Sequence, residues 1–204
     1  MMIFGFDPGG KSGAALLTDS QIGYFSGEVA TLISVGDAFD WLAARAPTTL
    51  EAAGIDSLIS WSLKRSGWRP MDLYLREKYP KIKNSVVPSN GLYGAMSVQG
   101  MAMAILLKKR WPSIILNETH PKVGYFAASR IRHRFGKQMI GWLEKQARWK
   151  HFPEISTEHE WDALYSALFT HQALSSDHRI DLIEATKAKE SLLFPAGQSN
   201  YFWL

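Results

Sequence analysis

The chain has 204 residues, of which 46% are hydrophobic and 12% aromatic, so it can bury a substantial core and global disorder is excluded. It contains no cysteine, which excludes disulfide scaffolds and thiolate zinc sites and leaves oxygen and imidazole groups as metal ligands. The formal net charge of +4 is mildly basic and indicates a polyanionic partner only weakly. The length predicts one domain over residues 1–204.

Targeting and membrane segments are not expected. The first residues, MMIFGFDPGG, contain no basic stretch followed by a long apolar one, so no signal peptide is predicted. The longest uninterrupted apolar run, residues 101–107, is far shorter than the ~20 residues that span a bilayer. We therefore expect a soluble, cytoplasmic protein without a membrane partner. The oligomeric state is left open, with a homodimer among the options.

Short apolar runs and helical periodicities alternate along the chain. Apolar runs bounded by turn residues predict strands at 3–7, 13–18, 21–29, 50–55 and 114–118. Helical spacing predicts helices at 34–47, 71–78, 91–110 and 158–174. The rest of 57–90 is predicted to be an irregular insertion. Three strands followed by alternating helices and strands favour a mixed sheet in an α/β or α+β domain.

The opening stretch GFDPGGKS, residues 5–12, fits two different chemistries. It matches the phosphate-binding loop G-x-x-x-x-G-K-[ST], which requires a helix of several turns directly after it. Residues 13–18 form only a short apolar run before a turn at Asp19 and Ser20, and Asp7 would repel a polyanion. We therefore favour the second interpretation, in which Asp7 ends the first strand, is exposed at a sheet edge and can hold a divalent cation. Taken alone, Asp7 is also an ordinary turn residue before Pro-Gly-Gly.

Three acidic residues end apolar strands, namely Asp7, Asp56 and Glu118. Neighbouring strands lie ~4.8 Å apart, so Asp7 and Asp56 can share an ion if their strands pair in the sheet. Glu118 has an ordinary alternative as a turn residue before Thr119-His120-Pro121.

The helix predicted at 158–174 carries a further acidic group. Asp162 lies beside its apolar stripe, and a partly buried carboxylate there needs a partner. His159 and Glu158 precede Asp162 by three and four residues, so all three can face one side of the helix. Glu158 also suits the positive end of the helix dipole, and Thr157-x-x-Glu160 reads as a structural capping box.

Together these residues suggest a site for Mg²⁺ or Mn²⁺. Mg²⁺ prefers a few oxygen ligands on rigid elements, and two such ions roughly 4 Å apart can stabilise the attacking and leaving oxygens of a phosphodiester. The candidate metal ligands are Asp7, Asp56, Asp162, Glu118 and Glu158. The candidate catalytic residues are Asp7, Asp56, Asp162 and His159.

Several short segments together resemble the RNase H-like superfamily, and most nearly its uncharacterised, predicted-nuclease branch related to the RuvC resolvases. These segments are IFGFDPG, AAGIDSLISW, GWRPMDLYLRE, ETHPKVGYF, EHEWDALYSALFTHQAL and ESLLFPAG. The resemblance implies a five-stranded mixed sheet, with three antiparallel strands and then parallel ones, flanked by helices, in which the first and fourth strands are neighbours. It also implies catalytic acids at Asp7, Asp56 and the last long helix, with Mg²⁺ or Mn²⁺ as cofactor.

Two positions depart from the resolvase pattern. Resolvases usually carry two acids one turn apart on that helix, and the first of these positions is His159 here. Glu158 can substitute for it, or the imidazole can orient the attacking water. The second acid of resolvases is usually a glutamate, where this chain offers Asp56. Both departures keep open a protein that binds nucleic acid without cleaving it.

Cations are concentrated in a basic helical segment at 122–151. They are Lys122, Arg130, Arg132, His133, Arg134, Lys137, Lys145, Arg148, Lys150 and His151, against Glu144 alone. Five aromatic residues are interleaved with them, a composition that suits a nucleic-acid surface but also a solvated helix face. The candidate nucleic-acid contacts are Lys11, Lys122, Arg130, Arg132, Arg134 and Lys137.

The sequence thus supports three hypotheses. The first is a metal-dependent nuclease that hydrolyses DNA or RNA phosphodiesters at a two-metal carboxylate site. The second is a catalytically inactive nucleic-acid-binding module with the same fold. The third is an actin-like or P-loop phosphotransferase that holds phosphate in the DPGGKSG turn.

Overall fold

A computed structural model describes residues 1–20, 23–88 and 94–204. Its centre is a mixed six-stranded sheet in the order β6-β4-β1-β2-β3-β7. The strands are β1 (Met2–Asp7), β2 (Ser12–Asp19), β3 (Phe25–Leu32), β4 (Ala52–Ile55), β6 (Ile115–Glu118) and β7 (Trp149–His151). β1, β2 and β3 pair antiparallel, and β4 lies parallel to both β1 and β6. The α/β class, the antiparallel-then-parallel order and the pairing of the first and fourth strands are confirmed.

The sheet has one strand more than the five expected. β7 pairs in parallel with β3 at the sheet edge, within the segment expected to be helical. That segment contains α4 (Pro121–Ser129) and α5 (Lys137–Glu144) before the strand begins. Trp149 packs its ring against Phe25 of β3, with ring centroids 5.8 Å apart. A pairing between residues so distant in sequence leaves no local signal.

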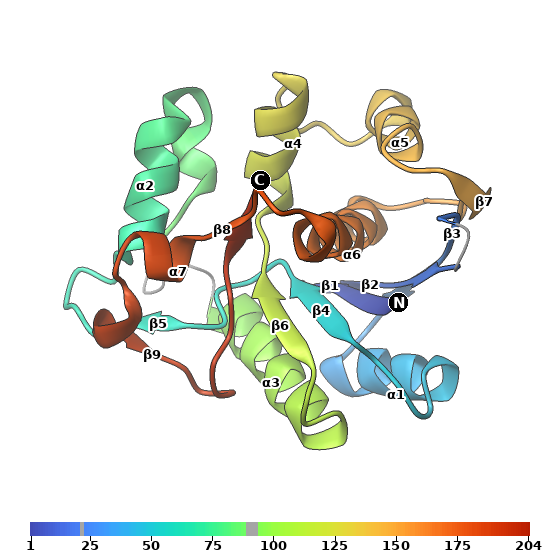
Figure 1. Ribbon diagram of the computed structural model, residues 1–204, viewed down its shortest axis with the longest axis horizontal. Coiled ribbons are helices and arrows are strands. Elements are labelled where there is room, and N and C mark those ends of the chain that lie inside the picture. Colours follow the sequence, from blue (N-terminus) through green and yellow to red (C-terminus); the bar gives the residue numbers. More distant parts are fainter. Residues whose placement is uncertain (21–22, 89–93) are drawn as a thin grey trace.

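Helices cover both faces of the sheet (Figure 1). α1 (Val35–Arg45) and α3 (Gly94–Arg110) pack on one face, and α6 (Glu158–Ser175) with α4 and α5 on the other. The first residues of the helix expected at 91–110 lie outside the described residues, as do the first two of the strand expected at 21–29. No helix in the described ranges is both long and apolar enough to cross a bilayer.

The segment expected to be an irregular insertion contains a short helix, as its periodicity indicates. β5 (Trp61–Ser62), α2 (Pro70–Lys78) and the 3₁₀ helix η1 (Pro80–Ser85) occupy it. β5 pairs with β9 (Leu192–Leu193), so a late part of the chain holds this segment. The remaining elements are β8 (Ile180–Asp181), α7 (Leu182–Ala185), η2 (Lys189–Ser191) and β10 (Phe202–Trp203).

The phosphate-loop interpretation of GFDPGGKS is wrong in this fold. Residues from Ser12 onward form β2, which pairs antiparallel with β1 from Asp7↔Gly13 to Met2↔Thr18. A strand follows the turn, so no helix N-terminus is present there to receive a phosphate. Asp7 consequently ends the central strand β1 next to a hairpin turn.

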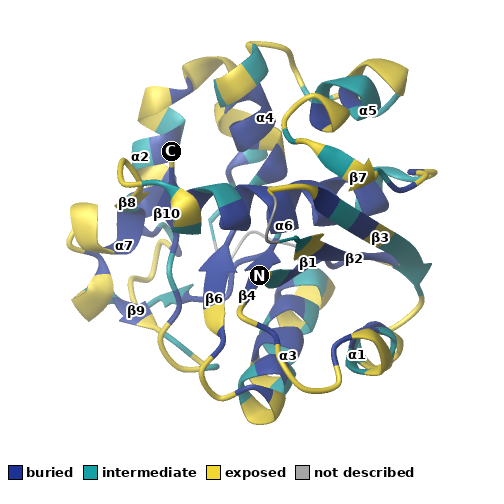
Figure 2. Cartoon of the chain, turned by 45° about the vertical axis from the view of Figure 1, so that its right-hand side comes forward, coloured by how far each residue is buried: buried dark blue, intermediate teal, exposed yellow. Residues whose placement is uncertain are grey.

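α6 is buried along most of its length (Figure 2) and lies unusually close to the sheet. Its N-cap is Thr157, whose hydroxyl accepts a hydrogen bond from the backbone N–H of Glu160, while the Glu160 side chain accepts one from the Thr157 N–H; the predicted capping box is confirmed. The sheet residues beneath the helix include Gly5, Gly13 and Gly54, one from each of three strands. A Cβ at Gly5 would overlap the carbonyl oxygen of Ala163. The absent side chains therefore let the helix backbone rest on the sheet, which brings Asp162 down to the strand ends.

Candidate active site

Asp7 and Asp56 lie side by side because their strands are parallel neighbours. Asp7 is the last residue of β1, and Asp56 directly follows β4. The register pairs Phe6 with Ile55, and the backbone N–H of Asp56 donates to the carbonyl oxygen of Phe6 at 2.8 Å. The two carboxylates therefore leave the same end of adjacent strands, as expected if one ion is shared.

Asp162 reaches the same place from α6. One carboxylate oxygen from each of Asp7, Asp56 and Asp162 lies within 4.8 Å of the other two. Asp7 and Asp162 are each only 3% exposed, whereas Asp56 is half-buried. The expectation that Asp7 is exposed at a sheet edge is wrong, because β1 is a central strand and α6 covers it.

The environment of these carboxylates disfavours their ionised forms, so their pKa values are raised. Burial raises the pKa of Asp7 to about 7, with the hydrogen bond from His159 opposing this and the charge of Asp162 adding to it. Burial also raises the pKa of Asp56 well above its usual value, helped by Asp7 and Asp162. The pKa of Asp162 is raised by burial, against a hydrogen bond from His133. A divalent cation would relieve this repulsion, and an all-carboxylate donor set at this spacing fits Mg²⁺ or Mn²⁺.

His159 contacts the first carboxylate directly. Its Nδ1 lies 2.5 Å from Asp7 Oδ2, and its side chain is 41% exposed. The hydrogen bond to Asp7 raises the pKa of the imidazole, although partial burial opposes the shift. The ring therefore contacts a buried carboxylate through Nδ1 while the side chain as a whole stays partly exposed.

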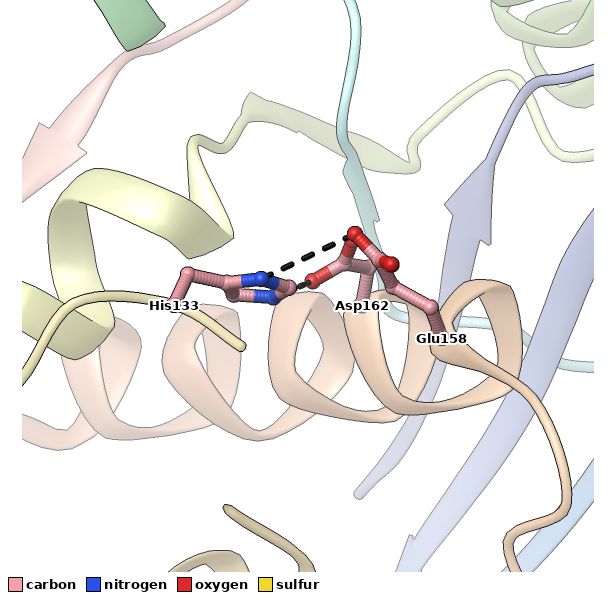
Figure 3. A group of neighbouring side chains, drawn as sticks. All are labelled: His133, Glu158 and Asp162. Atoms are coloured by element: carbon pink, nitrogen blue, oxygen red, sulfur yellow. Dashed lines mark hydrogen bonds and ion pairs between the residues drawn. The ribbon is translucent and has the colours of Figure 1, made fainter. Parts of the chain in front are cut away.

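A second group of potential ligands shares Asp162 (Figure 3). His133, in the segment between α4 and α5, points toward α6, where Asp162 and Glu158 lie one turn apart. His133 Nε2 is 2.8 Å from Asp162 Oδ1, and His133 Nδ1 is 3.6 Å from Glu158 Oε1. Ligand atoms of these three residues also lie within 4.8 Å of one another. Glu158 is further paired with Lys122, Nζ to Oε1 at 3.3 Å.

Glu118 belongs to a different constellation. It is buried and accepts hydrogen bonds from both terminal nitrogens of Arg69, with Nη2 2.5 Å from Oε1 and Nη1 2.8 Å from Oε2. Arg69 is itself fully buried and bonds Asp72 as well, with Nη2 2.6 Å from Oδ1. Since its oxygens are occupied by a guanidinium, Glu118 does not join the carboxylate group, and the expectation that it is a metal ligand is corrected.

Cations form a groove next to the carboxylates. A cavity of about 610 Å³ runs between η1 and the segment that precedes α5. Its cationic lining residues are Lys81, Lys122, Arg132 and Arg134; His133 also lines it, and Glu158 is the acidic residue. Phe135 adds an aromatic ring. We call this cavity the cationic groove; positive charge along its walls suits a phosphate backbone.

The six expected nucleic-acid contacts are not all in that groove. Lys122, Arg132 and Arg134 line it, whereas Arg130 and Lys137 border two other hollows. Lys11 is exposed in the turn between β1 and β2. The structure thus brings half of these cations together beside Glu158.

His133 and Lys81 were missed among the candidate groups. His133 appears in the sequence only as one cation in a basic run, and its carboxylate partner Asp162 lies 29 residues away. Lys81 lies in the insertion, where no motif points to the groove. Fixed helical spacing identified the pair Glu158 and Asp162, but no comparable spacing rule reaches across loops.

Comparisons with known proteins add one distant likeness. No family model matches the chain, and no curated protein matches it. Among solved structures, that of RuvC from Thermus thermophilus is similar at 14% sequence identity and a TM-score of 0.46, over 92% of this chain and 98% of that chain.

Proposed function

We propose that this protein is a metal-dependent nuclease that hydrolyses phosphodiester bonds in DNA or RNA. The observation that carries the proposal is the convergence of Asp7, Asp56 and Asp162, from two strands and a helix, within 4.8 Å. Holding two buried carboxylates and a half-buried one so close together is costly unless they bind a cation. The cationic groove beside them supplies the affinity for a polyanion that such a reaction requires.

The proposed ligands are Asp7, Asp56 and Asp162, with Glu158 on the groove side. Mg²⁺ or Mn²⁺ at these oxygens would neutralise the carboxylates and stabilise negative charge that develops on the phosphate. The sharing of Asp162 by two groups of potential ligands agrees with a two-ion arrangement. Rigid placement at two strand ends and on a buried helix keeps the oxygens fixed, so little reorganisation is needed.

His159 is proposed to move a proton at the open edge of the site. Its Nδ1 is held on Asp7, which fixes the ring and favours the protonated form. The remaining nitrogen, Nε2, would exchange a proton with water or with the leaving oxygen. Lys122 has a raised pKa because Asp162 and Glu158 offset its partial burial, so it stays charged and attracts a phosphate.

The decisive experiment compares cleavage by the unmodified protein with that by Asp7→Asn and Asp162→Asn. Single-stranded, branched and DNA–RNA hybrid substrates are incubated in Mg²⁺ and in Mn²⁺. We expect the unmodified protein to cleave and each variant to lose at least about 100-fold in rate, the scale of losing a group that stabilises transition-state charge. Mn²⁺ binding measured by calorimetry should weaken in parallel.

The matched control is Asp40→Asn, the same substitution on an exposed position of α1. It should leave both cleavage and Mn²⁺ binding unchanged. Cleavage that survives in both active-site variants would contradict the assignment.

The alternative function, a nucleic-acid-binding module without catalytic activity, rests on His159. Its ring is paired with a carboxylate oxygen of Asp7, at a helix position where resolvases usually carry an acidic residue. This alternative predicts salt-sensitive binding of nucleic acid with no cleavage in either metal. The same assay therefore decides between the two functions.

A further inference from the structure

A second cavity shares lining residues with the cationic groove and includes one of the proposed metal ligands. Its volume is about 270 Å³, and Asp56 stands on its rim. Its walls are mainly apolar, with aliphatic and thioether side chains from three parts of the chain: Leu58, Val86, Val87 and Met96. We call this cavity the apolar pocket. None of the proposed chemistry uses it.

His120 also lines the apolar pocket, and its Nδ1 is buried without a hydrogen bond in the part of the chain that the structure describes. Because that atom is shielded from the cavity, an occupant of the pocket does not reach it in this conformation. The contact that the pocket offers is therefore mainly its aliphatic surface.

The apolar pocket lies next to the cationic groove. Ser85 and Lys122 line both cavities, so Lys122 stands between them. Asp56 lines one cavity and Glu158 the other, so each cavity includes one of the proposed metal ligands. A ligand that spans both cavities has an anionic part in the groove and a flat apolar part in the pocket.

We propose that the apolar pocket receives one unpaired nucleobase of the nucleic acid whose backbone lies in the cationic groove. This inference rests on the proposed function and names its substrate class, a strand with an unpaired nucleotide next to the cleaved phosphodiester. The volume is slightly below the ~300 Å³ at which sites for small molecules begin, which suits one base and not a base pair. Every nucleobase has flat faces that pack against apolar side chains, so the aliphatic walls suit a base whatever its identity.

Two features argue against a phosphate or a free metal ion as the occupant. Aliphatic walls offer nothing to an anion, and the cations that attract phosphate lie in the neighbouring groove. The carboxylates of Glu118 and Asp72 at the pocket are already held by Arg69. Flipping a base out of a continuous duplex costs a few kcal/mol, so an already unpaired strand should be preferred.

The test measures binding of two single-stranded DNA probes of equal length by fluorescence anisotropy, with Ca²⁺ in place of Mg²⁺ to prevent cleavage. One probe carries bases, and the other is built only of tetrahydrofuran abasic nucleotides, so both present the same phosphates. We expect the unmodified protein to bind the base-carrying probe roughly tenfold more tightly, as expected from one buried base. Equal affinity for the two probes would overturn the proposal without any variant being needed.

Two matched variants locate the effect. Val87→Trp fills the apolar pocket, whereas Val98→Trp makes the same change at a position of α3 that is 62% exposed. Val87→Trp should bring the two probes to similar affinity while leaving the abasic one unchanged, and Val98→Trp should keep the tenfold preference. A preference that persists in folded Val87→Trp would place the base elsewhere and overturn the proposal.

The two proposals fail in different ways. If the protein cleaves in Mg²⁺ but binds both probes equally, with or without Val87→Trp, the proposed nuclease function is kept and the base-binding pocket is contradicted. If neither probe binds at any salt concentration, the proposed function falls, and the pocket falls with it.

Discussion

At the scale of single residues, the site depends on which carboxylates are paired with a cationic side chain and which are not. Asp56 and Glu118 look alike in the sequence, since each ends an apolar strand of the parallel half of the sheet. Asp56 has the acidic groups of Asp7 and Asp162 as its strongest charged neighbours, whereas Glu118 has the guanidinium of Arg69, 49 residues away in the chain. Only the tertiary fold separates these cases. The sequence therefore predicts which acids gather at the strand ends, but not which of them is already neutralised.

The raised pKa of Asp7 predicts a pH-dependent affinity for metal. A proton and a cation compete for Asp7, whose pKa in the metal-free protein is about 7. Mn²⁺ affinity should therefore fall by about tenfold for each pH unit below that value and level off above it. Calorimetric titration at about pH 6 and about pH 8 checks this, with Asp7→Asn expected to lose the step near neutrality.

The raised pKa of Asp7 also determines how the stability of the metal-free protein changes with pH. The folded-state pKa of Asp7 lies above its ordinary value of 3.8, so folding favours the protonated form. The metal-free protein should lose stability as the pH rises from that ordinary value to about 7. Added Mn²⁺ should restore Tm most strongly above pH 7. A metal-induced gain in Tm that is larger in acid would contradict the assignment of Asp7 as a ligand.

At the scale of elements, the distance between α6 and the sheet sets the geometry of the site. Helical periodicity identifies α6 and its acidic face, and the three strand-end signals identify β1, β4 and β6. The sequence does not predict how closely the helix approaches the sheet, because that depends on Gly5, Gly13 and Gly54 meeting one helix. β7 and the position of His133 depend likewise on contacts between distant segments.

Gly5→Ala should disturb the site without touching a ligand. The added methyl group meets the backbone carbonyl of Ala163, which cannot move unless α6 moves. We expect a loss of about 1–3 kcal/mol in the free energy of unfolding and weaker Mn²⁺ binding, because Asp162 shifts with the helix. Chemical denaturation and calorimetry measure the two effects. The control is Gly141→Ala in α5, where a Cβ meets no atom within 4 Å and should stabilise the helix slightly.

At the scale of the whole molecule, the cationic groove lies on the side of the sheet that carries α6. It runs between η1 and the segment before α5, whereas α3 covers the opposite face (Figure 1). The sequence identified the basic run at 122–151, but the wall supplied by η1 comes from the insertion. A net charge of +4 alone would not have located either wall.

Binding through this groove should weaken steeply with salt. Each phosphate neutralised contributes about −0.7 to the log–log slope on single strands and about −0.9 on duplex DNA. Arg132→Gln and Arg134→Gln should each reduce the steepness by roughly one such increment. Lys109→Gln, at an exposed position on α3, is the matched control and should leave the slope unchanged. Anisotropy titrations over a range of NaCl concentrations give the slopes, and equal slopes for all variants would remove the groove from the binding surface.

The ion pairs of Arg69 have a consequence for the way a strand is received. Arg69 directly precedes α2 and forms a buried ion pair with Glu118 at the end of β6. This ion pair anchors the inserted segment to the sheet. η1 follows α2 directly and forms part of the wall of both cavities. The surface that would bind a strand is therefore preorganised. The conformational entropy of η1 is lost when the protein folds, so it does not weaken the association with a strand.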